Sequence, residues 1–257
     1  MTAPERRFRL DGKLALVTGA SSGLGQHFAA VLAAAGARVA LAARRVDKLQ
    51  TTVNELTAAG LEARAFAMDV SDPTSVSQAF DTMSAWGTPD IVVNNAGVTV
   101  TKPALEQTVH DYDQVMDTNL KGCWWVATEA ARRLVAAKQP GCIVNVASIL
   151  AERVAGGVAP YAISKAGVLQ TTKALALELA RYRIRVNALL PGYVVTDLNR
   201  DFLMSEAGQK LKARIPSRQF CELSDLDGPL LLLASDAGAA MTGATIAVDG
   251  GHLVSSL

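Results

Sequence analysis

The chain has 257 residues and half of them are hydrophobic, which is enough for one sizeable α/β domain or two small ones. Its 25 basic and 24 acidic residues nearly cancel, which argues against a nucleic-acid binder. The charged segment 1–9 is unlike a signal peptide, and no apolar run reaches the roughly 18 residues of a membrane span. We therefore expect a cytoplasmic protein with neither a nucleic-acid nor a membrane partner.

Cysteine and histidine usage gives no sign of a metal site. The cysteines, Cys123, Cys142 and Cys221, have no metal-ligand spacing and form no even disulfide set. The three histidines also lack such spacing. We expect reduced thiols and no metal.

Short apolar runs alternate with longer helical stretches along the whole chain. This alternation is typical of a parallel sheet that is covered on both faces. Right-handed crossovers would then give a Rossmann-type doubly wound sheet of about seven strands, with helices on both faces, in a single domain over 1–257. The strands are expected at 14–17, 38–42, 63–67, 90–93, 143–147, 185–190 and 244–248.

A glycine-rich loop follows the first expected strand and opens a helix that should run to about residue 35. Glycines at such a turn let the backbone approach a pyrophosphate, and the helix amides attract its charge. An ordinary strand-to-helix turn is the alternative. The residues expected to bind a dinucleotide here are Gly19, Ser21, Ser22, Gly23, Leu24 and Gly25.

The end of the second strand bears on the identity of the cofactor. Ala43 stands where an acidic residue would select NAD, and Arg44 and Arg45 follow it with donors suited to a 2′-phosphate. A solvated basic pair is the alternative, but cations at a helix start oppose its dipole unless an anion binds. We expect NADP(H) to be favoured over NAD(H). Asp69 and Val70, after the third strand, are expected near the adenine, although Asp69 is equally compatible with a helix cap.

Lys165 lies four positions after Tyr161, which places the two side chains on one face of a helix. A nearby ammonium favours phenolate and would lower the pKa of the tyrosine. Tyr161 is therefore a candidate general acid and base.

Taken together, these motifs resemble the short-chain dehydrogenase/reductase family over essentially the whole chain. They follow the order and spacing of that family: the 18–25 loop, the 94–97 run Asn-Asn-Ala-Gly, Asn119, Ser148, Tyr161 with Lys165, and Pro191-Gly192.

The resemblance implies four catalytic residues. Tyr161 would exchange the proton with the substrate oxygen, and Ser148 would polarise that oxygen. Lys165 would hold the nicotinamide ribose and lower the pKa of Tyr161, while Asn119 would anchor a water that links Lys165 to solvent. Two hydroxyl donors and a cation suit the charge that develops on a carbonyl oxygen.

The resemblance also extends the cofactor site beyond the loop. Ribose and nicotinamide would be lined by residues at the ends of two further strands. They are Asn95, Ala96, Gly97, Pro191, Gly192, Val194 and Thr196, together with Tyr161 and Lys165.

A looser segment, about 194–226, is expected to form the substrate-binding loop. The candidate lining is mostly apolar, with no arginine placed to clamp a carboxylate, so we expect a hydrophobic ketone or secondary alcohol. The substrate-binding candidates are Ser148, Leu150, Val154, Val158, Tyr161, Tyr193, Phe202 and Met204.

Three alternatives remain open. A 3-oxoacyl-(acyl-carrier-protein) reductase would need a basic surface beside the cleft, for which the candidates are Arg132, Arg133, Lys138, Arg181 and Arg183. A sugar or polyol dehydrogenase would need polar groups that converge in the pocket. A non-catalytic NADP-binding regulator would need a damaged set of catalytic residues, and here the set is intact.

Two expected helices are apolar nearly all round, and a sheet covers only one face of a helix. One begins near Asn119 and carries Trp124, Trp125 and Leu134, and the other covers 161–180. Both should therefore meet copies of themselves across two-fold axes, as is usual in the family that the chain resembles. We expect a homotetramer, with a dimer as the alternative.

Overall fold

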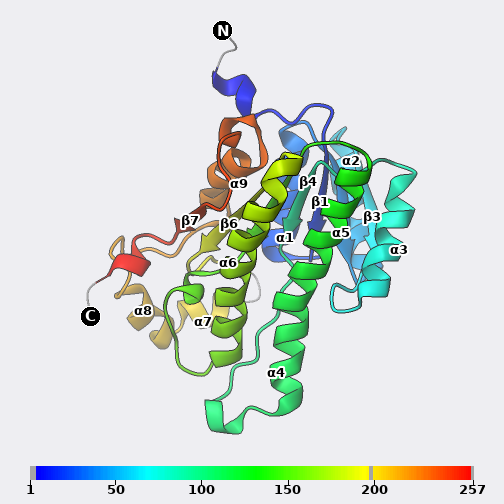
Figure 1. The fold of residues 1–257 in the computed structure, drawn as a ribbon. Helices are drawn as coiled ribbons and strands as arrows, with labels where there is room; N and C mark the ends of the chain where they lie inside the picture. The colour runs from blue at the N-terminus through cyan, green and yellow to red at the C-terminus, as the bar shows by residue number, and fades with distance from the viewer. Residues whose placement is uncertain (1–3, 197–198, 256–257) are drawn as a thin grey trace.

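The computed structural model describes residues 4–196 and 199–255. Its strands form a seven-stranded sheet, all parallel, in the order β3-β2-β1-β4-β5-β6-β7 (Figure 1). The expected doubly wound Rossmann-type sheet is confirmed. The strands are β1 (Leu14–Thr18), β2 (Arg38–Ala43), β3 (Ala63–Ala67), β4 (Ile91–Asn94), β5 (Gly141–Val146), β6 (Ile184–Pro191) and β7 (Thr245–Val248).

The third strand lies at 63–67 as predicted, and the other strands differ from the prediction by one or two residues at one or both ends. The fifth strand was expected at 143–147, but pairing begins at Gly141, opposite Ile184. Backbone hydrogen bonds set this boundary, and the apolar pattern that predicts strands does not report them. Val146 is the last residue of the strand, although the Ala147 amide still donates to Leu189 at 2.8 Å.

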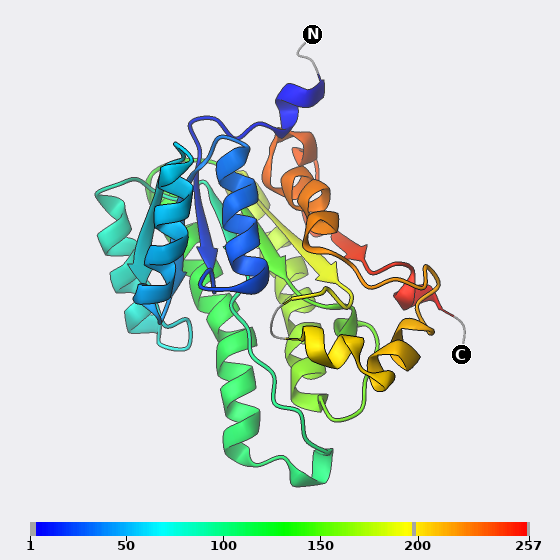
Figure 2. The ribbon, with the colours of Figure 1, turned by 180° about the vertical axis from the view of Figure 1, so that it is seen from behind.

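Helices cover both faces of the sheet. The buried side chains of α1, α2 and α9 pack on one face, and those of α3, α5 and α6 pack on the other (Figures 1 and 2). The helices are α1 (Gly23–Ala34), α2 (Val46–Ala58), α3 (Pro73–Ser84), α4 (Val109–Met116), α5 (Gly122–Ala136), α6 (Ala159–Leu179), α7 (Arg200–Met204), α8 (Glu206–Lys212) and α9 (Asp227–Ala234).

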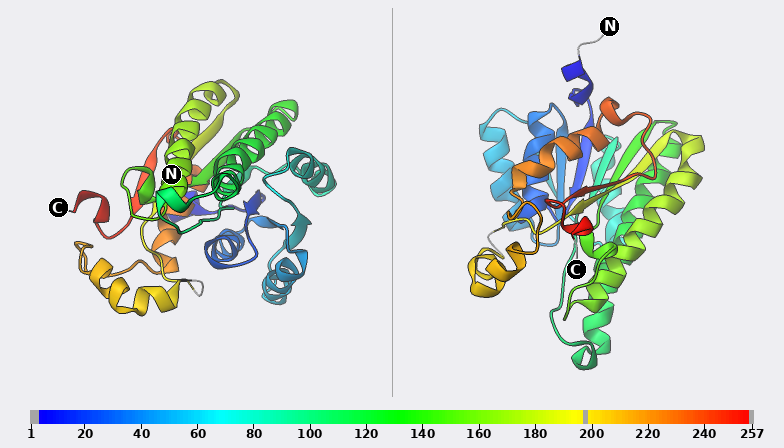
Figure 3. Two further views of the ribbon diagram at one scale, coloured as in Figure 1. Left: turned by 90° about the horizontal axis from the view of Figure 1, so that it is seen from below. Right: turned by 90° about the vertical axis from the view of Figure 1, so that its left-hand side faces the viewer.

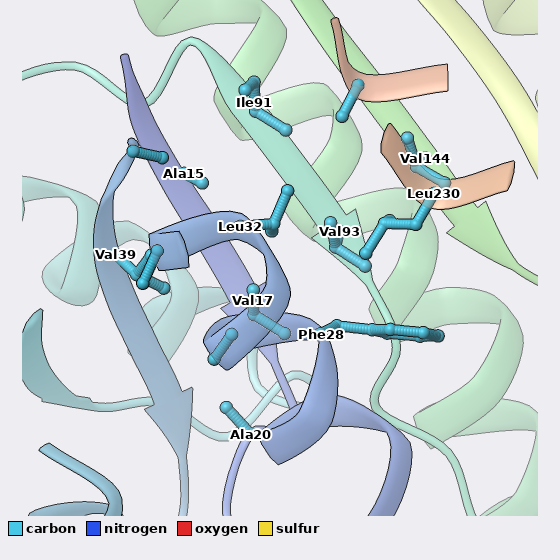
Figure 4. Close-up of a cluster of buried hydrophobic side chains, with 14 of the residues drawn as sticks. Ala15, Val17, Ala20, Phe28, Leu32, Val39, Ile91, Val93, Val144 and Leu230 are labelled. Atoms are coloured by element: carbon cyan, nitrogen blue, oxygen red, sulfur yellow. The ribbon is translucent and has the colours of Figure 1, made fainter. Parts of the chain in front are cut away.

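Figure 4 shows how the core fixes the first helix on the sheet. Phe28 and Leu32 of α1 are fully buried in the cluster that contains Val17 of β1 and Leu230 of α9. Burying a side chain of this size contributes about 1.5–3 kcal/mol. Because α1 is anchored in this way, the loop at its start is held rigidly against the strand ends.

The helix expected to begin near Asn119 begins earlier. Helix α4 starts at Val109, where Thr108 and Asp111 form a capping box. A π-helical turn, η3 (Asp117–Lys121), joins α4 to α5, so that the three elements run on as one long helix (Figure 1). Asn119 therefore lies within a helix, in a turn type that is frequent at functional sites.

The segment expected to form the substrate loop contains the two short helices α7 and α8. Val195, Leu203, Ile215 and Phe220 form a small buried cluster there, apart from the main core. In Figure 3 these helices project beyond the sheet, near the C-terminal turn of the chain. Leu198, which was also expected in this segment, lies outside the described residues.

Across residues 4–196 and 199–255, no helix combines the length and the apolar character that crossing a bilayer requires.

Candidate active site

The glycine loop packs against the end of β4. Gly19 has φ +65°, and a Cβ built on it would lie 2.8 Å from the Cα of Ala96. A Cβ on Gly25 would lie 2.4 Å from the carbonyl oxygen of Gly19. Larger residues at either position would displace the backbone, so the loop keeps its close approach only with glycine.

Thr18 and Asn95 tie this loop to β4 through hydrogen bonds. The Thr18 hydroxyl accepts from the backbone amides of Asn95 and Ala96, both at 3.1 Å. The Asn95 side-chain amide donates to the carbonyls of Thr18 at 3.0 Å and Gly19 at 3.3 Å. Asn95 therefore holds the loop backbone, and its amide nitrogen is already engaged.

The start of α1 has the features of a dinucleotide-phosphate cradle. Ser22 occupies the N-cap position without a side-chain capping bond, so the first helical amides keep donors for a ligand. A Cβ built on Gly23 would meet only the Thr196 methyl group, at 3.9 Å. Thr196 therefore lies close to the loop, although the two are far apart in sequence.

The basic pair after β2 lies beside this loop. Arg45 donates from Nη2 to the Ser21 hydroxyl at 3.2 Å. Arg44 is exposed, and no other described residue forms an ion pair or hydrogen bond with its side chain. A guanidinium in this position suits a phosphate.

The residues after β3 are engaged within the protein. The Asp69 carboxylate accepts from the backbone amide of Ser71 at 3.0 Å and its hydroxyl at 2.6 Å. Val70 is buried and packs against Gly122, where a Cβ would lie 2.8 Å from the valine side chain. Helix α3 is capped by Asp72, so Asp69 is not its N-cap residue.

Three of the four expected catalytic side chains gather where β5 ends and α6 begins. Ser148 follows β5, and Tyr161 and Lys165 lie in the first turns of α6. The Lys165 ammonium lies 5.6 Å from the centroid of the Tyr161 ring and donates to the carbonyl of Val146 at 2.8 Å. Lys165 is only 4% exposed, so its charge lies inside the protein.

The expected decrease in the pKa of Tyr161 is not found. Burial raises the pKa of Tyr161, and a hydrogen bond with Ser148 opposes that change only in part. Burial also lowers the pKa of Lys165 to about 8. A fixed ammonium charge would lower the pKa of the phenol, but desolvation disfavours the charged form of both groups.

Asn119 holds the backbone segment that lies beside Lys165. Its side-chain oxygen accepts from the Val98 amide at 2.8 Å, and its nitrogen donates to the Val98 carbonyl at 2.9 Å and to Ser164 at 3.0 Å. A Cβ built on Gly97 would lie 3.4 Å from the Asn119 oxygen and 3.6 Å from the Lys165 ammonium. These bonds hold the 97–98 backbone beside the lysine.

The end of β6 completes this edge of the sheet. Gly192 donates to the Val248 carbonyl at 2.9 Å, and a Cβ on it would lie 2.8 Å from the Cα of Asp249. Val194 is buried and bridges to Cys221. The residues expected near the nicotinamide therefore belong to the same edge as the glycine loop.

A cavity of about 810 Å³ is lined by Ile149 and Leu150, which directly follow Ser148 in the chain. Of the expected substrate-binding residues, Leu150, Val154 and Tyr193 line it. The others do not: Ser148, Val158, Tyr161, Phe202 and Met204. Phe202 is 53% exposed on α7. Burial raises the pKa of Tyr193, and the nearby Tyr161 raises it further, while Tyr193 also lines the cavity.

The cavity lining corrects the expectation that no arginine is available for a carboxylate. Arg153, Arg214 and Arg218 line it, together with His252 and Ser255. These polar lining residues were not predicted from the sequence because they come from three distant segments. The segments are the turn after β5, the second half of the 194–226 segment and the C-terminal turn. Only the tertiary fold brings these segments together.

Comparison with known proteins agrees with this geometry. The profile of the family described as enoyl-(acyl carrier protein) reductase matches residues 19–252. The chain belongs to the short-chain dehydrogenase/reductase family and has the family's Rossmann-type fold. It is an oxidoreductase that acts on CH-OH groups with NAD(P).

Its relatives act on different kinds of substrate. D-threitol dehydrogenase from Mycolicibacterium smegmatis is 37% identical over 248 residues, 96% of this chain and 95% of the relative. A 3-oxoacyl-(acyl-carrier-protein) reductase from Staphylococcus aureus is 36% identical over 241 residues, 93% of this chain and 97% of the relative. A crystal structure of a gluconate 5-dehydrogenase from Burkholderia cenocepacia, in complex with NADP and tartrate, superposes on this chain with a TM-score of 0.95. The two sequences are 35% identical, and the superposition covers 99% of this chain and 100% of that one.

Proposed function

We propose that this protein interconverts a ketone and a secondary alcohol with NADP(H), and that Tyr161 exchanges the proton. The observation that supports this best is that Ser148, Tyr161 and Lys165 gather where β5 ends and α6 begins, with the Lys165 ammonium 5.6 Å from the centroid of the Tyr161 ring and the cavity beginning at Ile149. Ser148 and Tyr161 place two hydroxyl donors where the oxygen of a substrate would lie. Such donors stabilise the charge that develops on that oxygen.

The residues present fit a nicotinamide dinucleotide. Gly19 and Gly25 leave space that a Cβ would fill, and the α1 amides are free to receive the pyrophosphate. Arg44 and Arg45 would hold the 2′-phosphate, and Thr196 would close the other side of the loop. When bound, the cofactor supplies or accepts the hydride.

Proton exchange depends on residues of this chain. Burial raises the pKa of Tyr161, so the phenol stays protonated at neutral pH and is ready to donate in the direction of ketone reduction. In the oxidation direction, a phenolate must form, and the Lys165 ammonium 5.6 Å from the ring would stabilise it. Asn119 would keep Lys165 in place through the 97–98 backbone.

The lining of the cavity favours a polar, hydroxylated substrate over the hydrophobic ketone expected from the sequence. Arginine, histidine and tyrosine side chains converge there, which was the discriminating feature for a sugar or polyol dehydrogenase. The D-threitol and gluconate dehydrogenases among the relatives support the same class.

An acyl-carrier-protein reductase is the second candidate, because one relative has that activity. The basic residues suggested for carrier docking lie at the far end of the sheet. Arg132 and Arg133 occupy the last turns of α5 and pair with Glu129, and Arg183 precedes β6. In a parallel sheet, these positions lie at the amino ends of the strands, away from Ser148 and Tyr161.

A substrate panel run with NADPH and NADH in parallel tests the proposal. Wild-type protein should turn over hydroxylated ketones or their alcohols, and Tyr161→Phe should reduce turnover at least a hundredfold while NADPH binding survives. The phenylalanine keeps the ring but removes the exchangeable proton. Retention of more than a few per cent of activity would exclude Tyr161 as the acid.

A further inference from the structure

The wall of the cavity has an excess of positive charge. Arg153, Arg214 and Arg218 line it, and no described lining residue is acidic. None of the three forms an ion pair with a carboxylate in the described part of the chain. Cations that gather in a concave site without counter-charges are suited to an anionic ligand.

Arg153 is positioned by the C-terminal turn η8 (His252–Val254) and the residue after it. Its Nη1 donates to the carbonyl of His252 and to the Ser255 hydroxyl, the latter at 2.6 Å. A guanidinium has five N–H donors, and its remaining nitrogens have no hydrogen-bond partner among the described residues. The side chain is therefore fixed at one end and keeps donors for a ligand.

His252 supplies an unpaired polar atom at the same place. The residue is 9% exposed and lines the cavity, and its buried Nδ1 has no hydrogen-bond partner among the described residues. Its ring centroid lies 5.8 Å from that of Tyr193, which stands near Tyr161. An unpaired buried nitrogen is unfavourable unless a ligand or water completes it.

The charged groups around His252 are Arg153, Arg214 and Asp249. Burial lowers the pKa of His252, Arg153 and Arg214 lower it further, and Asp249 opposes them. The Asp249 carboxylate already accepts from the amides of Gly251 at 2.9 Å and Leu253 at 2.7 Å. Asp249 therefore faces backbone amides, and it forms no ion pair with either arginine within residues 4–196 and 199–255.

We propose that Arg153 and Arg214, with His252 beside them, bind the carboxylate of a polyhydroxy acid whose alcohol carbon lies at Tyr161. This rests on the proposed function and names the substrate class for the same site. Arginine donors recognise a carboxylate bidentately, and the neutral imidazole can bond a hydroxyl or a carboxylate oxygen. Tyr193 would lie between the carboxylate end and the reacting end of the substrate.

Calorimetric titration of the NADP-loaded protein tests this with two matched pairs, gluconate against glucitol and tartrate against threitol. Each pair differs in whether carboxylate or hydroxymethyl groups end the carbon chain. Wild-type protein should bind each acid at least tenfold more tightly than its polyol, and Arg153→Gln and Arg214→Gln should each remove most of that preference. Arg132→Gln, at the opposite end of the sheet, is the matched control and should leave it unchanged.

The titration is repeated in Tyr161→Phe, so that binding is separated from turnover. Tyr161→Phe should still bind each acid more tightly than its polyol. If it does so while wild-type protein shows no turnover, the proposed reaction fails and the carboxylate site stands. Equal binding of acid and polyol, or a preference that survives both arginine variants, would overturn the carboxylate site. Acetoacetyl-coenzyme A binding that depends on the arginines, without any preference for the acids, would overturn it in favour of an acyl carrier.

Discussion

Arg44 is the residue on which the proposed cofactor preference depends most. It is exposed beside the glycine loop, and Ala43 before it carries no acid to repel a phosphate. Arg44→Asp should lower kcat/KM for NADPH at least tenfold and shift preference toward NADH, because a charge-assisted contact is replaced by repulsion. Steady-state kinetics with both cofactors measures the change.

Lys48→Asp is the matched control for that substitution, since Lys48 is also exposed and lies in the first turns of α2. It makes the same charge change farther along the helix and should leave the preference unaltered. Tighter binding of NADH than NADPH by the wild-type protein would contradict the role given to Arg44.

Lys165 should make the stability of the cofactor-free protein depend on pH. Burial lowers the pKa of Lys165 in the folded protein to about 8, from an ordinary value of 10.5. Between these values, the unfolded chain binds more protons, so the free energy of unfolding contributed by this group rises with pH, by roughly 3 kcal/mol in all. Below pH 8, the lysine is charged in both states, and burial of the ammonium lowers the free energy of unfolding by the full amount.

Urea unfolding at several pH values checks this, with Lys165→Met as the reference because other groups also titrate in the range. The difference in stability between the two proteins should shift in favour of wild type as pH rises from 8 to 10.5. A difference that stays constant with pH would mean that the lysine keeps its ordinary pKa in the fold.

The candidate catalytic residues could be proposed from sequence because their spacing is local or ordered along the chain. Tyr161 and Lys165 share one helix, and Ser148 follows the strand before it by two residues. The direction of the pKa change of Tyr161 was not predictable, since burial outweighs the nearby ammonium. Arg153 and Arg214 were missed for another reason, because nothing in the sequence shows that they face one cavity.

At the scale of elements, the π-helical turn η3 links the long helix α4–α5 to the active site. It places Asn119 where the side chain bonds both backbone groups of Val98 and the Ser164 hydroxyl. Sequence periodicity predicted a helix in this region but not the turn, because a π-turn changes backbone hydrogen bonding without changing which residues are apolar. The early start at Val109 was missed for a similar reason, since a cap depends on Thr108 and Asp111.

Asn119→Ala should test how far this turn supports the site. It leaves the part-buried amide of Val98 without its partner, so we expect a loss of about 1 kcal/mol in unfolding free energy. Turnover should also fall, because the 97–98 backbone beside Lys165 is no longer held. Thr118→Ala, in the same turn, is the control and should change both quantities much less. Equal losses in the two variants would show that the turn matters only for helix stability.

At the scale of the whole molecule, the alternation of strands and helices predicted a parallel, doubly wound sheet, whereas the order of its strands comes from the structure. Helices α5 and α6 lie side by side on one side of the sheet (Figures 1 and 3). Each buries one face against the sheet, as the apolar pattern predicted, and keeps apolar side chains on its outer face. Trp124, Ile163 and Leu177 are 39%, 51% and 82% exposed in the single chain.

We predict a homotetramer, with a dimer as the alternative, in which these outer faces meet copies of themselves. A two-fold axis would bury the same patch on both subunits, and such burial would remove the exposed leucine from water. Light scattering at micromolar concentration should give a mass four times that of one chain. Leu177→Arg should lower that mass by placing charges opposite one another across the axis, whereas Lys173→Ser, on the same exposed helix, should not. A wild-type protein that is monomeric and active would show that α5 and α6 need no partner chain.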